Sequence, residues 1–445
     1  MKVLIVGAGQ VGESIARDLA PDHKVTIVDK RSERTEELAY GYDVLTTTGD
    51  GTELSTLQEA GLSDSDMLIA STDDDETNIV ACSTAAVHSE AFTIARIKHN
   101  KYLRTWEGVD RAFGIDDMVC TNLLTARSIV RVVGLPAAID VDPFAGGRVQ
   151  MAEFDISESC PVVDQTVAEA DRYDSLTFAA VIRDDEVVIP DGETTIAAGD
   201  RVVVIGSPES VHSFADGLEP GHHSGADEEI TVFGGSEIGY HVTRILSERG
   251  FSPRMIEQDH DRARELAEQL PAAQIMESDA TDMEFLERER IDEADVVVAA
   301  LESDEKNLLV SLLAKRLGVD RTVAVIDTPA YVELFEAVGV DVAINPRIVV
   351  AEEITRLTQS EKTENVALIE SDKAEVIEVE IDADSVLAGR PIQESVADLP
   401  DGVVIGAITR DTSFVTPRGD TEIQPGDHVV LFVDAAAIEA TTNKL

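Results

Sequence analysis

Three glycines near the start of the chain have the spacing of a phosphate-binding loop. A short apolar run at residues 2–6 predicts a buried strand, and the motif Gly7-Ala8-Gly9-Gln10-Val11-Gly12 follows it at once. In such a strand–loop–helix unit the first glycine permits a tight turn and the second lets backbone approach a pyrophosphate. The third lets the helix pack closely on the strand. The start of the helix then offers free N–H groups to phosphate.

Asp29 stands where a dinucleotide-binding protein holds the adenine ribose. It ends a second apolar run, residues 25–28, and lies 20 residues after Gly9. A carboxylate there accepts hydrogen bonds from both ribose hydroxyls and repels a 2′-phosphate, which favours NAD-type over NADP-type ligands. Glycine-rich turns also occur in other α/β units, but strand, helix and terminal acid in register together predict a nucleotide site.

The charge of the chain is strongly acidic. Among 445 residues, 36 are basic and 87 are acidic, which gives a formal net charge of −51. Such a surface repels itself in dilute salt, and the repulsion becomes tolerable near 1 M salt, where the Debye length is about 3 Å. We therefore expect a protein from a halophilic cytoplasm. The same charge argues against a nucleic-acid partner, which needs basic contacts to phosphate.

Cysteine usage and hydropathy favour a soluble cytosolic protein. Cys82, Cys120 and Cys160 are far apart and form no CxxC motif, so we expect buried free thiols in a reducing compartment. The first strand already begins at Lys2, so no signal peptide is expected, and no apolar run approaches the roughly 18 residues that span a bilayer.

The chain is a duplication. A second glycine-rich loop, Gly234-Gly235-Ser236-Glu237-Ile238-Gly239, follows another apolar run, and Gly234 lies 227 residues after Gly7. Asp29 corresponds to Glu257 at an offset of 228, and Asp50 to Asp279 at an offset of 229. Similar offsets over this length indicate two copies of one unit.

Each copy divides into an α/β part and a smaller β-rich part. Strands expected at 44–47, 67–70 and 93–97 alternate with helices expected at 53–60 and 78–88, which predicts a doubly wound parallel sheet. Strands at 273–276, 296–300 and 322–326 repeat that order. Helices at 121–133 and 349–357 lead out of the two sheets, either as crossover helices that pack on a neighbour or as surface helices.

The smaller parts contain short strands separated by turn residues. Arg183 corresponds to Arg410 and Asp200 to Asp427, each at an offset of 227. The linker between the copies contains His222 and His223, for which a solvated loop is favoured over a metal site, because no acid or thiol cluster accompanies them.

Ligands of doubly wound sheets bind beyond the carboxyl ends of the strands. Arg96, near the end of the fifth strand, would face a phosphate or carboxylate there, or form an internal salt bridge. The acidic run at 73–76 is interpreted as the entry to a helix rather than a cation site. The first candidate site comprises the loop residues Gly7, Ala8, Gly9, Gln10, Val11 and Gly12, with Asp29, Lys30, Asp50, Gly51, Thr72, Asp73 and Arg96.

The second site differs from the first in its charge. Ser236 replaces the middle glycine, and Glu237 places a carboxylate at the helix start, where it opposes a pyrophosphate. Val325 replaces Arg96. We expect this site to bind a nucleotide weakly, to bind a less charged ligand, or to be empty. Its residues are Gly234, Gly235, Ser236, Glu237, Ile238, Gly239, Glu257 and Asp279.

No catalytic motif accompanies these sites. The sequence has no GxSxG or HExxH motif and no recognisable His dyad. Binding without chemistry is favoured, and a soluble NAD-dependent oxidoreductase is the alternative. No metal site is expected.

The motifs GAGQVG, TGDGT, TDDDETNIVAC and ARI, in this order and in a duplicated plan, resemble the TrkA family, the cytosolic regulators of Trk-type potassium uptake systems. The resemblance implies tandem regulator-of-K⁺-conductance (RCK) domains, each a Rossmann-like lobe and a small α+β C-terminal lobe. It also implies NAD(H) in the first lobe, with ATP or ADP as other adenine-nucleotide ligands. A homotetrameric ring on the inner face of the cell membrane would then control a separate membrane K⁺-translocating subunit.

The expected domain boundaries follow from the repeat and from this resemblance. They are 1–118 for the first Rossmann-like lobe, 119–138 for its connecting helix, 139–218 for the first C-terminal lobe, 219–228 for the linker, 229–345 for the second Rossmann-like lobe, 346–365 for its connecting helix, and 366–445 for the second C-terminal lobe.

Overall fold

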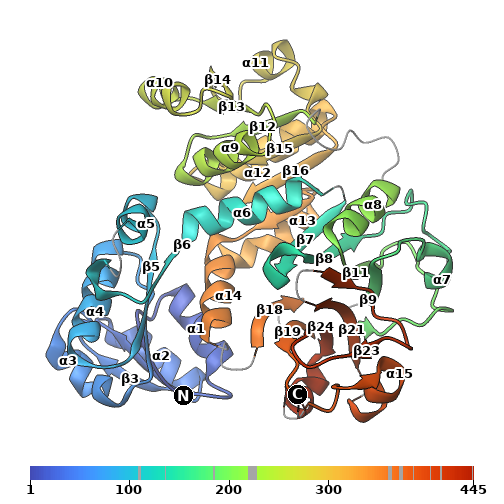
Figure 1. Ribbon diagram of the computed structural model, residues 1–445. Coiled ribbons are helices and arrows are strands. Elements are labelled where there is room, and N and C mark those ends of the chain that lie inside the picture. Colours follow the sequence, from blue (N-terminus) through green and yellow to red (C-terminus); the bar gives the residue numbers. More distant parts are fainter. Residues whose placement is uncertain are drawn as a thin grey trace. The chain divides into compact units, whose positions relative to one another are not determined.

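The computed structural model describes residues 1–108, 112–135, 137–183, 186–218, 228–358, 363–369, 374–383, 385–400, 402–410, 413–442 and 444. The chain folds into two compact units (Figure 1). One consists of Met1–Val130 and Glu228–Leu357, and the other of Arg131–Asp227 and Thr358–Leu445. Each unit therefore gathers like parts of the two copies, the Rossmann-like lobes in one and the small β-rich lobes in the other.

The first Rossmann-like lobe is a six-stranded parallel sheet in the order β3-β2-β1-β4-β5-β6. The order reverses between β1 and β4, which is where doubly wound folds bind their ligands. Its elements are β1 (Lys2–Val6), α1 (Gln10–Leu19), β2 (Lys24–Asp29), α2 (Ser32–Gly41), β3 (Leu45–Thr48), α3 (Leu54–Glu59), β4 (Met67–Ala70), α4 (Asp75–His88), β5 (Phe92–Ile97), α5 (Asn100–Glu107), β6 (Asp117–Cys120) and α6 (Thr121–Val133).

The second Rossmann-like lobe repeats this plan in the order β14-β13-β12-β15-β16-β17. Its elements are β12 (Ile230–Phe233), α9 (Glu237–Glu248), β13 (Arg254–Glu257), α10 (His260–Gln269), β14 (Gln274–Glu277), α11 (Met283–Arg288), β15 (Val296–Ala299), α12 (Asp304–Leu317), β16 (Arg321–Val325), α13 (Val332–Ala337), β17 (Val342–Ile344) and α14 (Pro346–Thr358).

The predicted fold class is confirmed, and the central strands lie where their apolar runs predict them. β4 and β15 are buried along their whole length, as expected for parallel strands covered by helices on both faces. The sixth strand of each sheet is missing from the sequence prediction. β6 and β17 are only four and three residues long and run directly into or close to a helix, so they give no separate apolar period.

Helix α14 is the second copy's connecting helix, yet it packs on the first lobe. Its residues Val350, Ala351 and Ile354 are at most 1% exposed and belong to the apolar cluster that includes Ile5 of β1 and Ile15 of α1. Figure 1 shows α14 beside α1. Of the two interpretations left open for this segment, the structure supports the helix that packs on a neighbour.

The other unit contains two antiparallel five-stranded sheets, in the orders β10-β9-β11-β8-β7 and β18-β19-β24-β21-β22. The first copy supplies β7 (Ala138–Phe144), β8 (Val149–Asp155), α7 (Val167–Ala170), β9 (Leu176–Arg183), β10 (Glu186–Val188), β11 (Arg201–Gly206) and α8 (Pro208–Leu218). The second supplies β18 (Thr363–Ile369), β19 (Ala374–Glu380), β20 (Arg390–Pro391), α15 (Ile392–Ser395), β21 (Val403–Arg410), β22 (Ser413–Val415), β23 (Glu422–Ile423), β24 (His428–Asp434) and α16 (Ile438–Thr442).

These two sheets share one apolar core. Phe144 and Ile205 of the first copy belong to the same buried cluster as Val376 and Phe432 of the second. A Cβ on Gly406 would lie 2.5 Å from the Ile205 side chain, so a glycine lets the two sheets approach closely there. The two small lobes thus stabilise one another by burying their facing strands.

Cys82, Cys120 and Cys160 are buried free thiols, as predicted, and burial raises the pKa of Cys120 to about 11. His222 and His223 lie outside the described residues. Within the described part of the chain, no helix has the length and apolar composition required to cross a lipid bilayer.

Candidate functional site

The loop between β1 and α1 has the geometry that its glycines predict. Gly7 has a φ of 110°, a left-handed value that strains an L side chain. A Cβ on Gly12 would lie 1.9 Å from the Gly7 carbonyl oxygen, so α1 packs directly on the loop. A Cβ on Gly9 would meet nothing within 4 Å. The loop is therefore open at the residue where a diphosphate would approach.

The first turn of α1 is available to an anion. Its N-cap residue is Gly9, and no described side chain accepts a capping hydrogen bond there. The early N–H groups of a helix have no partner within the helix, and they carry the positive end of its dipole. An external acceptor such as phosphate would satisfy them.

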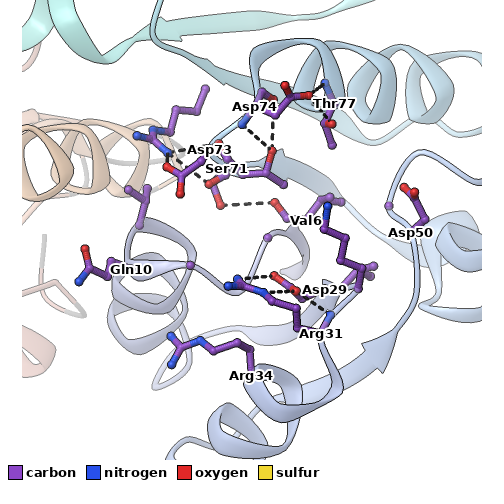
Figure 2. Close-up of a pocket in the computed structure, with 18 of the residues that line it drawn as sticks. Val6, Gln10, Asp29, Arg31, Arg34, Asp50, Ser71, Asp73, Asp74 and Thr77 are labelled. Carbon is purple, nitrogen blue, oxygen red and sulfur yellow. Dashed lines mark hydrogen bonds and ion pairs between the residues drawn. The ribbon is translucent and has the colours of Figure 1, made fainter.

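Asp29, at the end of β2, is held by the backbone and by a neighbouring arginine. Its carboxylate accepts from the Ala8 amide at 2.8 Å, the Arg31 amide at 2.9 Å, and the Arg31 guanidinium at 3.1 and 3.2 Å. Burial opposes ionisation, but the hydrogen bonds from Arg31 and Ala8 outweigh it, so the pKa of Asp29 lies below its ordinary value. Figure 2 shows Arg31 lying against Asp29, so a ribose would share this carboxylate with the guanidinium.

Arg96 lies on the other side of the switch point and is almost fully buried. Its guanidinium donates to the Thr121 hydroxyl at 3.1 Å and the Thr72 carbonyl at 3.2 Å, and it lies 3.5 Å from the Asp73 carboxylate. Burial lowers the pKa of Arg96, and Asp73 only partly offsets this effect. Arg96 thus forms an internal salt bridge and also lines the cavity, so the two interpretations of this residue are compatible.

The acidic run at 73–76 is a helix entry, as predicted. Asp74 caps α4 by accepting from the Thr77 amide at 2.8 Å. Asp75 accepts from the backbone amides of Lys98 and His99 at 2.8 and 3.1 Å, and from the His99 ring at 2.7 Å. The structure therefore contains an acid–histidine pair that the sequence did not predict.

The pair of Asp75 and His99 has a structural origin. In the second copy, Asp304 accepts from the amides of Asp327 and Thr328 at 2.7 and 3.1 Å, with no histidine involved. Both aspartates accept from backbone amides, but only Asp75 also contacts a histidine ring. The shared role of the two aspartates is therefore to hold the loop that follows the fifth strand of each sheet.

The predicted first-site residues surround one cavity of about 540 Å³, a volume in the range of small-molecule sites (Figure 2). Ala8 and Gly12 are not in its lining; they support it through the Asp29 contact and the α1 packing. The lining residues that the sequence predicted are Gly7, Gly9, Gln10, Val11, Asp29, Lys30, Asp50, Gly51, Thr72, Asp73 and Arg96.

Three arginines of the lining, Arg31, Arg34 and Arg347, are missing from the prediction. Arg31 could have been predicted, because it lies just beyond the carboxyl end of β2, where ligands of this fold bind. Arg34 donates to the Ala8 carbonyl at 3.1 Å, and its counterpart Arg262 donates to the Gly235 carbonyl at 2.9 Å, so a closer comparison of the repeats could have found it. Arg347 lies on α14 of the second copy and has no local sequence signal.

Asp50 and Asp279 have the same local role. Asp50 accepts from the Thr52 amide and hydroxyl at 2.9 and 2.7 Å, and Asp279 accepts from the same groups of Thr281 at 2.8 Å each. These contacts lower the pKa of Asp50. Both acids shape the loop after the third strand, and only Asp50 is in the described cavity lining.

In the second lobe, the loop is filled by its own side chains. Ser236 caps α9 by accepting from the Gly239 amide at 3.2 Å, and it donates to the Ala300 carbonyl at 2.7 Å. A Cβ on Gly235 would lie 2.3 Å from Leu266 and 2.9 Å from the carboxylate of Glu257. A serine hydroxyl therefore occupies the helix start that an incoming phosphate would need.

The second lobe keeps Arg262 at the position of Arg34 but lacks three other cations found around the first site. Gln258, Val325 and Asp327 stand at the positions of Lys30, Arg96 and Lys98, at offsets of 228, 229 and 229. Glu237 and Ile238 begin α9 where Gln10 and Val11 begin α1. Glu257 accepts from the amides of Gly235 and Asp259, which are the contacts that Asp29 makes in the first lobe. This charge balance disfavours a bound anion.

The cavity supplies binding groups. Its described lining residues include no histidine, cysteine or tyrosine, and two of its arginines pair with its acids, Arg31 with Asp29 and Arg96 with Asp73. It combines a free helix start, cations on both sides and one ribose-type carboxylate. Such groups suit a ligand that carries both a phosphate and a ribose.

Comparison with protein-family models gives two matches in each copy. Residues 3–121 and 230–346 match the TrkA-N domain, and residues 151–218 and 376–445 match the TrkA-C domain.

Curated relatives match over nearly their whole length. The chain is 36% identical to the Trk system potassium uptake protein TrkA homolog 1 of Methanosarcina mazei, over 98% of each chain. It is 35% identical to the TrkA homolog of Archaeoglobus fulgidus, over 99% of this chain and 98% of the relative. It is 32% identical to TrkA of Vibrio alginolyticus, over 97% and 96%.

Solved structures show the same fold at low identity. The GsuK RCK domain aligns with a TM-score of 0.61 and 18% identity, over 100% of this chain and 94% of that chain. The GsuK channel bound to NAD aligns with a TM-score of 0.61 and 18% identity, over 100% and 78%.

Proposed function

The chain belongs to the TrkA family of Trk system potassium uptake proteins, and from that premise we propose that it is a nucleotide-sensing regulatory subunit whose first Rossmann-like lobe binds NAD(H) or an adenine nucleotide. The observation that carries this proposal is the cavity at the first glycine-rich loop, with its uncapped helix start and its ribose-type carboxylate Asp29. The GsuK channel bound to NAD, which shares the fold, supports it.

We propose further that the second lobe binds a nucleotide weakly or is empty. Ser236 already caps its helix, and the uncharged Gln258 and Val325 replace Lys30 and Arg96 of the first site. A single occupied lobe in each chain would make the response depend on one ligand-binding equilibrium.

The regulatory mechanism we propose is a population shift. A nucleotide moves the equilibrium between two lobe arrangements only by its difference in affinity for them. The change would pass to a separate membrane K⁺-translocating subunit. In this proposal each copy, residues 1–218 and 229–445, is one RCK domain, and four chains form a ring at the inner face of the cell membrane.

Binding to the first lobe can be tested with matched variants of the two ribose-type acids. We expect Asp29→Asn to weaken NAD or ADP binding by about 10- to 100-fold, since hydrogen bonds to a charged group contribute about 1.5–3 kcal/mol. The amide keeps an acceptor for the Ala8 N–H. Isothermal titration calorimetry in molar KCl measures the affinity.

Glu257→Gln is the control, because Glu257 holds the corresponding amides in the second lobe. It should leave the affinity unchanged. Loss of binding in Glu257→Gln but not in Asp29→Asn would place the ligand in the second lobe and contradict the proposal. Robust NADH turnover with hydroxy acids or aldehydes would instead favour an oxidoreductase.

Salt dependence follows from the net charge of −51. We expect the melting temperature to rise with KCl and to level off near 1 M, because the Debye length falls from about 10 Å at 0.1 M to about 3 Å at 1 M. Thermal melts followed by circular dichroism measure this rise. NaCl at equal ionic strength should act similarly, and a melting temperature indifferent to both salts contradicts the prediction.

A further inference from the structure

One cation of the first-lobe cavity comes from the second copy of the repeat. Arg347 is the second residue of α14, and its guanidinium donates to the side-chain oxygen of Gln10 at the start of α1. It lines the cavity with Arg96 and Asp73. The side chain therefore lies where the glycine-rich loop and the loop after β4 face one another.

The position of Arg347 is fixed by the packing of its helix. Val350, Ala351 and Ile354 are buried in the apolar core of the first lobe, so α14 cannot move relative to α1 without exposing them. The packing of α14 in this core therefore places Arg347, at the start of the helix, in the cavity lining. Only a tertiary contact places it there, since Gln10 is 337 residues away in the sequence.

The charge around Arg347 favours an anion. The cavity lining contains five cationic residues and four acidic ones, in a chain whose formal net charge is −51. Asp73 lies 3.5 Å from Arg96 and 3.2 Å from Lys98, so this one carboxylate faces several cations. Asp74 is engaged in capping α4. Arg347 and the buried Arg96 line the same cavity and repel one another, and a phosphate that contacts both guanidinium groups would offset this repulsion.

Arg347 has no equivalent in the first copy, although its helix does. The TrkA-N matches end at residues 121 and 346, so Asn122 of α6 stands at the position of Arg347. The sequence thus provides this cation only on the helix that packs on the first lobe. The asymmetry parallels the loss of Arg96 to Val325 in the second lobe.

We propose that Arg347 binds the diphosphate of the nucleotide in the first lobe, so that one bound ligand joins the two copies of the repeat. This inference rests on the proposed nucleotide site and adds its recognition of phosphate. Arginine suits the role because its planar fork pairs with two phosphate oxygens. The ligand class is a nucleoside diphosphate or a dinucleotide, and adenosine alone would not engage the residue.

Calorimetric titrations of the full chain in molar KCl with ADP, NAD and adenosine test this role. We expect Arg347→Gln to weaken ADP and NAD by about 10- to 100-fold and to change adenosine less than about twofold. Arg347→Lys keeps the positive charge but not the planar guanidinium, so its affinity for ADP and NAD should lie between those of the wild type and Arg347→Gln. The control Arg264→Gln removes the same charge from the second copy at a side chain that is 77% exposed, and it should bind as wild type does.

Hydrogen exchange of α14 provides a second readout. ADP should slow exchange of the α14 amides in the wild type, and it should not do so in Arg347→Gln. If Arg347→Gln loses the same affinity for ADP as for adenosine, the role of Arg347 is overturned while the nucleotide site stands. The same follows if Arg347→Gln melts as the wild type does and its ADP affinity is unchanged. A wild type that binds none of the three ligands would instead overturn the proposed function and this inference together.

Discussion

Gly12→Ala is expected to destabilise the first Rossmann-like lobe by roughly 3 kcal/mol or more, because overpacking against rigid backbone forces the structure to shift. A Cβ at this position would lie 1.9 Å from the Gly7 carbonyl oxygen and 3.0 Å from the Ser71 hydroxyl. Helix α1 would have to move away from the loop, and the cavity would lose its shape. Denaturant unfolding in molar KCl measures the loss.

Two glycine variants separate folding from binding. Gly9→Ala meets nothing within 4 Å, so it should fold normally and lose nucleotide affinity, because its methyl group stands where the diphosphate approaches. Gly239→Ala should destabilise the second lobe, since its Cβ would lie 2.1 Å from the Gly234 carbonyl oxygen. A Gly9→Ala protein that binds NAD and ADP as the wild type does would contradict a diphosphate at this loop.

Arg183→Ala is expected to destabilise the β-rich unit by about 1.5–3 kcal/mol, because it removes the charged hydrogen-bond donor of a buried carboxylate. Asp200 is 2% exposed and accepts from the Arg183 guanidinium at 2.7 and 2.5 Å and from the Ala197 amide at 2.7 Å. Arg410 and Asp427 repeat the pair in the second copy, at 2.7 Å for both contacts. Chemical denaturation compares the variant with the wild type.

The pH dependence of this loss identifies its cause. Burial opposes ionisation of Asp200, but the hydrogen bonds from Arg183 and Ala197 outweigh it and hold its pKa below the ordinary value. Such a group stabilises the fold fully above its unfolded pKa, about 3.9, and the contribution is lost as pH falls through the folded pKa. The difference in unfolding free energy between the wild type and Arg183→Ala should therefore become smaller at acid pH.

A surface pair provides the control for this prediction. Arg264 and Glu268 lie 3.6 Å apart with side chains 77% and 73% exposed, so Arg264→Ala should cost at most about 1 kcal/mol. A loss from Arg183→Ala that is as small as this, or that stays constant down to acid pH, would count against the Arg183–Asp200 pair as the source of stability.

The repeat, the fold class and most of the first site could be predicted from local patterns. Strands such as β1 and β4 are continuous apolar runs, and the glycine spacing of the loop reflects backbone constraints within one strand–loop–helix unit. Asp29 was found because the carboxyl end of a strand has a known place in this fold. The short edge strands β6 and β17 have too few residues to give such a signal.

By itself, the sequence determined two tandem Rossmann-type copies, an acidic surface and a glycine-rich loop with a ribose-type acid, because each depends on composition or on neighbours along the chain. Only the tertiary structure decided that α14 packs on the first lobe and brings Arg347 to its cavity. The tertiary structure likewise decided that the Arg31 guanidinium pairs with the Asp29 carboxylate. It also decided that Ser236 caps the second loop. The partner of a buried charge or an unpaired N–H depends on which distant segments are packed together, and local periodicity carries no record of that choice.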